Sequence, residues 1–137
     1  MNTATPSIVL TSNDVQRLET MLDSAQYRDA PGAEALRAEL ERARVVAPQE
    51  LPRDVISMNS TAECVDEASG RARALTLVYP READAAQGRI SVLAPVGAAL
   101  LGMKVGQSID WPAPSGTLRL RVTAVRYQPE AAGEYHR

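Results

Sequence analysis

The stretch ISVLAPVGAALLGMKVGQSIDW, residues 90–111, carries the clearest structural signal in the chain. An apolar run leads to Pro95, which fits the first turn of a helix because that turn needs no amide hydrogen. Gly102 and Gly106 then suit a helix C-cap and a tight turn before the next apolar positions. The pattern predicts a strand, a short helix, a glycine-closed corner and a second strand.

Alternating apolar residues on both sides of this stretch predict further strands. Residues 55–58 are a candidate short strand, and residues 62–66 and 73–79 flank a polar turn as the arms of a β-hairpin would. In the last strand the apolar positions change phase, which indicates a β-bulge near residues 123–125. Together these segments predict an α+β domain in which a bent antiparallel sheet wraps around one short helix.

The first third of the chain predicts two short helices. Thr11 and Asp14 have the Thr-x-x-acid spacing of a helix start, and apolar residues follow at helical spacing. Turn-forming residues at 24–32 interrupt the pattern, and a second apolar helical face runs through residues 36–47. We expect an antiparallel, coiled-coil-like helical hairpin over residues 1–47.

Two prolines mark the expected boundary between the hairpin and the sheet. Pro48 and Pro52 cannot continue a helix, and both restrict the backbone between them. We therefore expect a linker at residues 48–52 and a C-terminal domain over residues 53–137. A linker this short and stiff favours packing of the hairpin against the sheet over loose tethering.

Composition argues against several classes of protein and site. The chain of 137 residues is 45% hydrophobic and 23% charged with a net charge of -2, which suits a globular protein without a general affinity for nucleic acid. No apolar run is long enough to span a bilayer and no signal peptide is recognisable, so a cytoplasmic location is expected. Cys64 and His136 are the only residues of their types, which disfavours a disulfide, a zinc site or a thiol nucleophile.

The residues around Pro95 resemble those of the Gre transcript-cleavage factors of bacterial RNA polymerase. In that family a small residue and a proline are followed by Ala-Leu-Leu-Gly and then by Val-Gly, as they are at residues 94–106. The resemblance implies an FKBP-like fold for the C-terminal domain. A further set of strings, combined with a short hairpin, is similar to the Rnk-like group of this family: residues 58–60, 77–80, 94–102 and 127–133.

The resemblance implies a regulator and not an enzyme. Rnk-like proteins compete with Gre factors for RNA polymerase and are named for an effect on nucleoside diphosphate kinase levels. The chain is expected to dock near the polymerase secondary channel as a monomer, to reach DNA or RNA only through the polymerase, and to need no membrane or cofactor. The alternatives are an interaction module acting directly on the kinase, or an FKBP-like prolyl isomerase, although only 4% of residues are aromatic and none is Phe.

Three consecutive residues are candidate polymerase contacts. In Gre factors the residues at the start of the short helix dock on the polymerase, and the matching residues here are Leu93, Ala94 and Pro95. Strand parity directs Leu93 away from the core-facing positions. Gre factors can carry an acid at this place, so Leu93 would make the contact hydrophobic. Leu93 would serve equally well as packing beneath the hairpin.

The hairpin tip, Gln26, Tyr27, Arg28 and Asp29, is expected to face the channel. Gre factors place acidic side chains there, which help to hold a second magnesium ion for RNA cleavage by the polymerase. In this chain Arg28 beside Asp29 opposes a cation, although Asp23 one turn back could contribute a ligand. The first helix would span only ~20 Å at 1.5 Å per residue. We therefore assign no catalytic residue and no metal, and expect competition without transcript cleavage.

Overall fold

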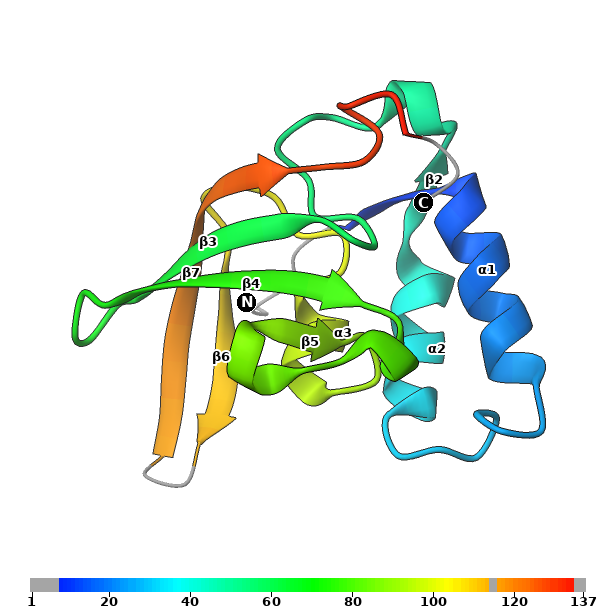
Figure 1. Cartoon of the computed structure of the whole chain (residues 1–137), viewed down its shortest axis with the longest axis horizontal. Helices are drawn as coiled ribbons and strands as arrows, with labels where there is room; N and C mark the ends of the chain where they lie inside the picture. Colours follow the sequence, from blue (N-terminus) through cyan, green and yellow to red (C-terminus); the bar gives the residue numbers. More distant parts are fainter. Residues whose placement is uncertain (1–7, 114–115, 135–137) are drawn as a thin grey trace, which may run out of the picture.

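The computed structural model of the chain describes residues 8–113 and 116–134. A curled five-stranded sheet forms one part of the molecule, and the two helices of the N-terminal hairpin stand beside it (Figure 1). This arrangement confirms the predicted α+β class. Within the described ranges, no helix has the length and apolar character needed to cross a membrane.

The hairpin consists of α1 (Ser12–Asp23) and α2 (Ala33–Arg42), which run in opposite directions (Figure 1). α1 begins where the sequence predicts, because Thr11 is its N-cap and the Thr11 Oγ1 accepts a hydrogen bond from the Asp14 amide at 3.0 Å. Each helix buries one face. The buried residues are Asp14, Leu18 and Leu22 on α1, and Ala33, Leu36 and Leu40 on α2.

The prediction of a second helix reaching residue 47 is wrong. α2 ends at Arg42, and β2 (Arg44–Val46) follows and pairs in parallel with β1 (Val9–Thr11). The two valines of β2 are β-branched, which favours a strand once a partner edge is available. The pairing joins the segment that enters α1 to the segment that leaves α2.

The large sheet has the strand order β5-β4-β3-β7-β6. Its strands are β3 (Thr61–Asp66), β4 (Ala72–Val78), β5 (Arg89–Ser91), β6 (Ser108–Ala113) and β7 (Gly116–Tyr127). Neighbouring strands are antiparallel except β4 and β5, which are parallel, so the prediction of a wholly antiparallel sheet is wrong at this edge. The connection from β4 to β5 passes through the short 3-10 helices η2 (Pro80–Glu82) and η3 (Ala85–Gln87). It carries the chain back along the sheet, so that β5 runs in the same direction as β4.

The β-hairpin and the β-bulge that the sequence predicts are both present in the large sheet. β3 and β4 pair as antiparallel neighbours, as expected for residues 62–66 and 73–79. The pairing of β3 with β7 shifts register because Glu63 lies opposite Ala124 while Cys64 lies opposite Val122. Thr123 is therefore an extra residue on β7, within the predicted bulge.

Residues 55–58 do not form the predicted strand. Val55 makes an isolated bridge to Lys104, and the chain then turns because the Ser57 amide bonds to the Ser60 Oγ at 3.0 Å. Asn59 in this turn has a φ of 67°, a left-handed conformation that a regular strand excludes.

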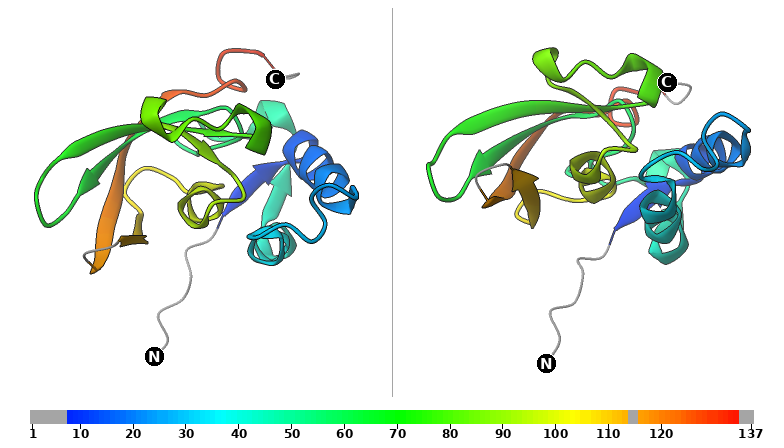
Figure 2. Two further views of the ribbon diagram at one scale, coloured as in Figure 1. Left: turned by 60° about the horizontal axis from the view of Figure 1, so that its bottom comes forward. Right: turned by 90° about the horizontal axis from the view of Figure 1, so that it is seen from below.

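α3 (Pro95–Leu100) lies within the concave side of the curled sheet (Figure 2). Pro95 occupies the first helical turn, as the sequence predicts. A Cβ added to Gly97 would lie 2.0 Å from the backbone oxygen of Ser91, so the backbone of α3 touches the end of β5 directly. This close approach fixes the start of α3 relative to the sheet.

One hydrophobic core extends through the hairpin and the sheet. Its members include Leu18, Leu22 and Leu36 from the hairpin, and Met58, Leu77 and Leu100 from the rest of the chain.

The coiled-coil-like and FKBP-like descriptions stay predictions, as do the domain limits 1–47, 48–52 and 53–137. A further 3-10 helix, η1 (Pro48–Glu50), lies within the predicted linker.

Candidate protein-docking site

The candidate contact residues Leu93, Ala94 and Pro95 lie together in the turn between β5 and α3. Ser91 shapes this turn, because its Oγ accepts from the Leu93 amide and its backbone oxygen accepts from the Ala94 amide, both at 3.0 Å. Leu93 and Ala94 are half-buried and Pro95 is exposed. We call these three residues the Pro95 ridge.

Two apolar grooves flank the Pro95 ridge, and Ala94 and Pro95 line both of them. The first, the β5 groove, has a volume of about 400 Å³ and is also lined by Ala83, Ala85, Arg89, Ile90, Ser91 and Val96. The second, the hairpin groove, has a volume of about 460 Å³, and its other walls include Pro31, Ala35, Leu93 and Ala99. The ridge is therefore a projection between two concave apolar surfaces.

The sequence left two roles open for Leu93, packing beneath the hairpin and contact with a partner. The Leu93 side chain packs against the core and also lines the hairpin groove. Gly32, the N-cap of α2, has a φ of 89°, and an added Cβ there would lie 2.0 Å from the Leu93 backbone oxygen. The hairpin loop thus rests on the backbone of the ridge.

The predicted tip residues lie in the loop between α1 and α2. Gln26, Arg28 and Asp29 are exposed, and Tyr27 is half-buried. The Arg28 Nε lies 3.7 Å from the Asp29 Oδ2 in an exposed ion pair. From α2, the Arg37 Nη2 donates to the backbone oxygen of Arg28 at 2.8 Å and so helps to fix the loop.

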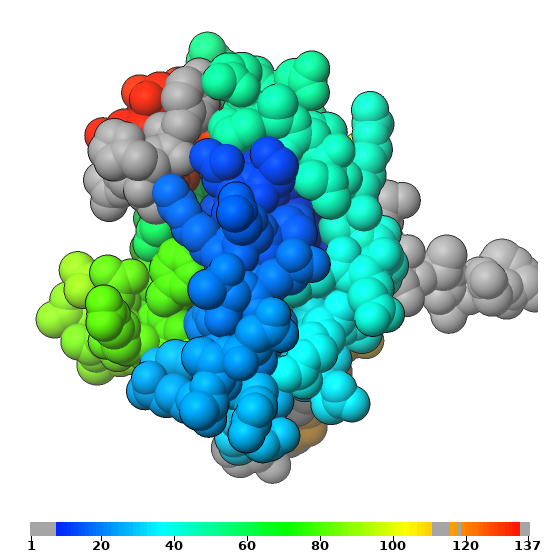
Figure 3. Space-filling view, turned by 90° about the vertical axis from the view of Figure 1, so that its right-hand side faces the viewer, coloured from blue at the N-terminus to red at the C-terminus, as the bar shows by residue number. Residues whose placement is uncertain are grey.

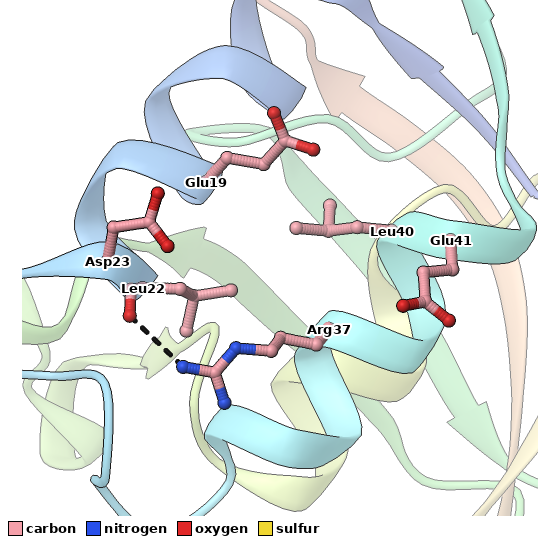
Figure 4. Close-up of a pocket in the computed structure, with 6 residues that line it drawn as sticks. All are labelled: Glu19, Leu22, Asp23, Arg37, Leu40 and Glu41. Carbon is pink, nitrogen blue, oxygen red and sulfur yellow. Dashed lines mark hydrogen bonds between the residues drawn. The ribbon is translucent and has the colours of Figure 1, made fainter.

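The outer side of the hairpin is acidic. Glu19 and Asp23 from α1 and Glu41 from α2 surround a groove of about 280 Å³, and Arg37 crosses it to donate to the backbone oxygen of Leu22 at 3.1 Å (Figure 4). Across residues 8–113 and 116–134, no group of three or more His, Cys, Asp or Glu side chains could hold a metal ion. The described residues therefore provide no metal site at the hairpin.

A third concave surface lies between the hairpin and the sheet domain. Viewed from the hairpin side, the green segment after β4 lies beside the blue helix α1 (Figure 3). A groove of about 410 Å³ separates the hairpin loop from this segment, and its lining includes Tyr27, Tyr79, Pro80 and Arg81. Burial raises the pKa of Tyr79 to about 12.

Asp14 is a buried polar residue that the sequence pattern predicts only as a helix-start acid. Its Oδ2 accepts a hydrogen bond from the Met58 amide at 3.0 Å, and 2% of the residue is exposed. Burial raises the pKa of Asp14 to about 7, although the Met58 hydrogen bond opposes this shift. The signal was available, because Asp14 precedes Leu18 and Leu22 at intervals of one helical turn and so shares their buried face.

A hydrogen-bonded network next to Asp14 joins the end of β7 to the loop at residues 57–60. The Ser57 Oγ donates to the Glu130 Oε1 at 2.6 Å and lies 2.8 Å from the Ser60 Oγ. The Gln128 Nε2 donates to the backbone oxygen of Val55 at 2.7 Å. These contacts hold the loop that receives α1.

Two family descriptions match the chain in sequence order. Residues 6–46 match "Rnk N-terminus", and residues 51–127 match "Transcription elongation factor, GreA/GreB, C-term". The chain therefore belongs to the GreA/GreB family of transcription elongation factors, in a form that carries an Rnk N-terminus. The resemblance found in the sequence is confirmed.

Individual relatives cover nearly the whole chain. The "Regulator of nucleoside diphosphate kinase" of Escherichia coli K12 is 44% identical over 131 residues, which are 95% of this chain and 96% of that protein. "Transcription elongation factor GreA" of Azorhizobium caulinodans is 32% identical over 89% of this chain and 83% of that protein. The relatives are thus named as a regulator and a transcription factor.

Solved structures show the same fold. A GreA/GreB elongation factor from Nitrosomonas europaea is 46% identical, with a TM-score of 0.77 over 89% of this chain and 99% of that chain. GreA factor homolog 1 of Thermus thermophilus is 25% identical, with a TM-score of 0.51 over 89% of this chain and all of that chain. The described fold is therefore similar to that of GreA/GreB proteins.

Proposed function

We propose that this protein docks on RNA polymerase through the Pro95 ridge, near the mouth of the secondary channel, and competes there with Gre-type factors. The proposal rests mainly on one observation, the exposed ridge between two apolar grooves at the start of α3. Family membership supports RNA polymerase as the partner, because GreA/GreB proteins are transcription elongation factors.

The chemistry of the ridge favours a hydrophobic contact. Apolar side chains of the polymerase would enter the β5 groove and the hairpin groove on either side of Pro95, and their removal from water would contribute roughly 25 cal/mol for each Å² buried. Leu93 adds apolar surface where Gre factors can carry an acid. Arg89 at the β5 groove would meet an acidic residue at the edge of the contact.

We further propose that the protein does not stimulate transcript cleavage. α1 has 12 residues and therefore spans only ~18 Å at 1.5 Å per residue. At the tip Asp29 is paired with Arg28, which opposes the binding of a magnesium ion. The hairpin would then occupy the channel mouth without supplying ligands to the polymerase active centre.

Introducing a negative charge at the grooves tests the docking surface. We expect Leu93→Glu and Ala85→Glu each to weaken binding to core RNA polymerase by about tenfold or more, because each buries a carboxylate in an apolar contact. Val45→Glu is the matched control, since Val45 is 49% exposed but lies on β2. Surface plasmon resonance would measure the affinities. Equal binding by all three variants and the unchanged protein would contradict the docking site.

A cleavage assay tests the regulatory role. Added to a backtracked polymerase complex with magnesium, the protein is expected to release no RNA above background and to slow cleavage by a Gre factor. Leu93→Glu should lose this inhibition. Efficient cleavage caused by the protein alone would contradict the proposal.

Direct action on nucleoside diphosphate kinase is the second candidate function, favoured by the name of the Escherichia coli relative. In the first candidate, an effect on the kinase would arise through transcription. Pull-down from cell extract distinguishes the two, because polymerase subunits would be recovered in the first case and the kinase in the second. Loss of polymerase subunits, but not of the kinase, in Leu93→Glu would assign the Pro95 ridge to the polymerase.

A further inference from the structure

Asp14 connects the first turn of α1 to the loop at residues 57–60, which we call the Met58 loop. The contact is a hydrogen bond from the Met58 amide to the Asp14 Oδ2 at 3.0 Å, buried between the hairpin and the sheet domain. We propose that Asp14 is a proton-sensitive latch: α1 is held firmly on the Met58 loop while the carboxyl is neutral, and its ionisation loosens the contact.

The placement of Asp14 is unusual for an acid at a helix start. In a capping box the acid at this position reaches back to the N-cap amide. Here the Thr11 half of that arrangement is present, since the Thr11 Oγ1 accepts from the Asp14 amide, but the Asp14 carboxyl bonds to Met58 in another part of the chain. The side chain therefore forms part of the contact between the hairpin and the sheet domain.

Charged and titratable groups approach Asp14 from three elements. Arg17 lies on α1, Tyr79 follows β4, and Glu130 follows β7. Ser57 holds Glu130 in place through a hydrogen bond of 2.6 Å. A charge on Asp14 would thus be favoured by Arg17 but opposed by Glu130 and by burial.

Burial has the largest effect on this carboxyl. It raises the pKa of Asp14 from 3.8 to about 7, and Glu130 adds to the increase, while the Met58 hydrogen bond and Arg17 act against it. In the unfolded chain the pKa would return to its ordinary value. The stabilising effect of the bound proton is therefore complete below about pH 4 and is lost as the pH rises through about 7.

The loop that receives α1 is itself firmly attached to the sheet. The Asn59 amide donates to the backbone oxygen of Leu77 at 2.6 Å, and the Ser60 backbone oxygen accepts from the Leu77 amide at 3.0 Å. Loosening at Asp14 would for this reason release α1 from the loop, while the loop stays on β4.

NMR titration of the Asp14 side-chain carbon measures the latch directly in the unaltered protein. We expect a midpoint near pH 7, about three pH units above that of an exposed aspartate. Glu130→Gln should lower this midpoint, because it removes a nearby negative charge and keeps an oxygen for the Ser57 hydroxyl. A midpoint near pH 4 in the unaltered protein would overturn the proposal.

Unfolding and amide exchange test whether the titration is coupled to the contact. From pH 5.5 to pH 7 the folding equilibrium constant is expected to fall by up to about tenfold per pH unit. Asp14→Asn should abolish this dependence because the side-chain amide does not titrate, while its oxygen can still accept from the Met58 amide. Asp23→Asn is the matched control: Asp23 is exposed at the other end of α1, and this variant should behave as the unaltered protein does.

The Met58 amide provides the local readout. Its exchange protection should fall by up to about tenfold between pH 6 and pH 8 in the unaltered protein, after correction for the intrinsic exchange rate, and should stay constant in Asp14→Asn. Two results together would show that Asp14 titrates near pH 7 without acting as a latch. The Met58 protection would stay constant with pH, and the stability of the unaltered protein and of Asp14→Asn would depend on pH in the same way.

Discussion

The hairpin and the sheet domain obtain their stability in different ways. The five strands of the large sheet are held by hydrogen bonds to one another. The helices α1 and α2 have only 12 and 10 residues, and isolated helices of this length are only marginally stable in water. The hairpin leucines enter the same core as Met58 and Leu77. The hairpin therefore takes its position from tertiary packing, and its shape depends on contacts with the sheet.

The largest expected effect comes from removing a shared core side chain. Leu36 on α2 is fully buried, and Leu36→Ala should lower the free energy of unfolding by about 3 kcal/mol through lost burial and the cavity that remains. Circular dichroism would follow the helices, and the amide NMR signals of β3, β4 and β7 would follow the sheet. Coincident transitions are expected. Separate transitions would show that the hairpin unfolds independently.

A smaller effect is expected at the contact between the hairpin loop and the ridge. Gly32→Ala would place a Cβ against the Leu93 backbone oxygen at a positive φ, and should cost about 2 kcal/mol. Gly70→Ala is the matched control, because Gly70 also has a positive φ of 76° but has no atom within 4 Å of an added Cβ. It should cost about 1 kcal/mol. Equal losses in urea unfolding would contradict a tight contact at Gly32.

The smallest effect concerns the hairpin loop itself. Arg37→Ala removes hydrogen bonds to the backbone oxygens of Leu22 and Arg28 and should lower stability by about 1 kcal/mol. Arg28→Ala removes an exposed ion pair with Asp29 and should change stability by less than ~0.5 kcal/mol. Urea unfolding of both variants measures the difference. Indistinguishable stabilities would mean that Arg37 does not hold the loop.

Features coded by neighbouring residues were predictable from the sequence. Thr11 caps α1 and Pro95 begins α3 because each acts through its own backbone and the next turn. The end of α2 was missed because Val45 and Val46 pair with β1, more than thirty positions earlier in the chain. The close approach of Gly32 to Leu93 is also non-local. No spacing within either segment reveals the other.

The candidate site divides in the same way. Leu93, Ala94 and Pro95 are consecutive, so a family resemblance could place them together before the fold was described. The grooves beside them could not be predicted, because their walls come from the hairpin, from α3 and from the segment before β5. Asp14 was recognised only as part of a helix start, since its contact with Met58 links positions 44 residues apart.

The pairing of β1 with β2 gives the hairpin a fixed base. Both ends of the hairpin are fastened side by side, so it has no free joint at its base about which to swing. β1 also contacts the segment that follows α3, where the Val9 amide donates to the backbone oxygen of Gly102 at 3.4 Å. The base of the hairpin is thereby joined to the segment that follows α3. The hairpin loop and the Pro95 ridge would therefore meet a partner in a fixed relative position.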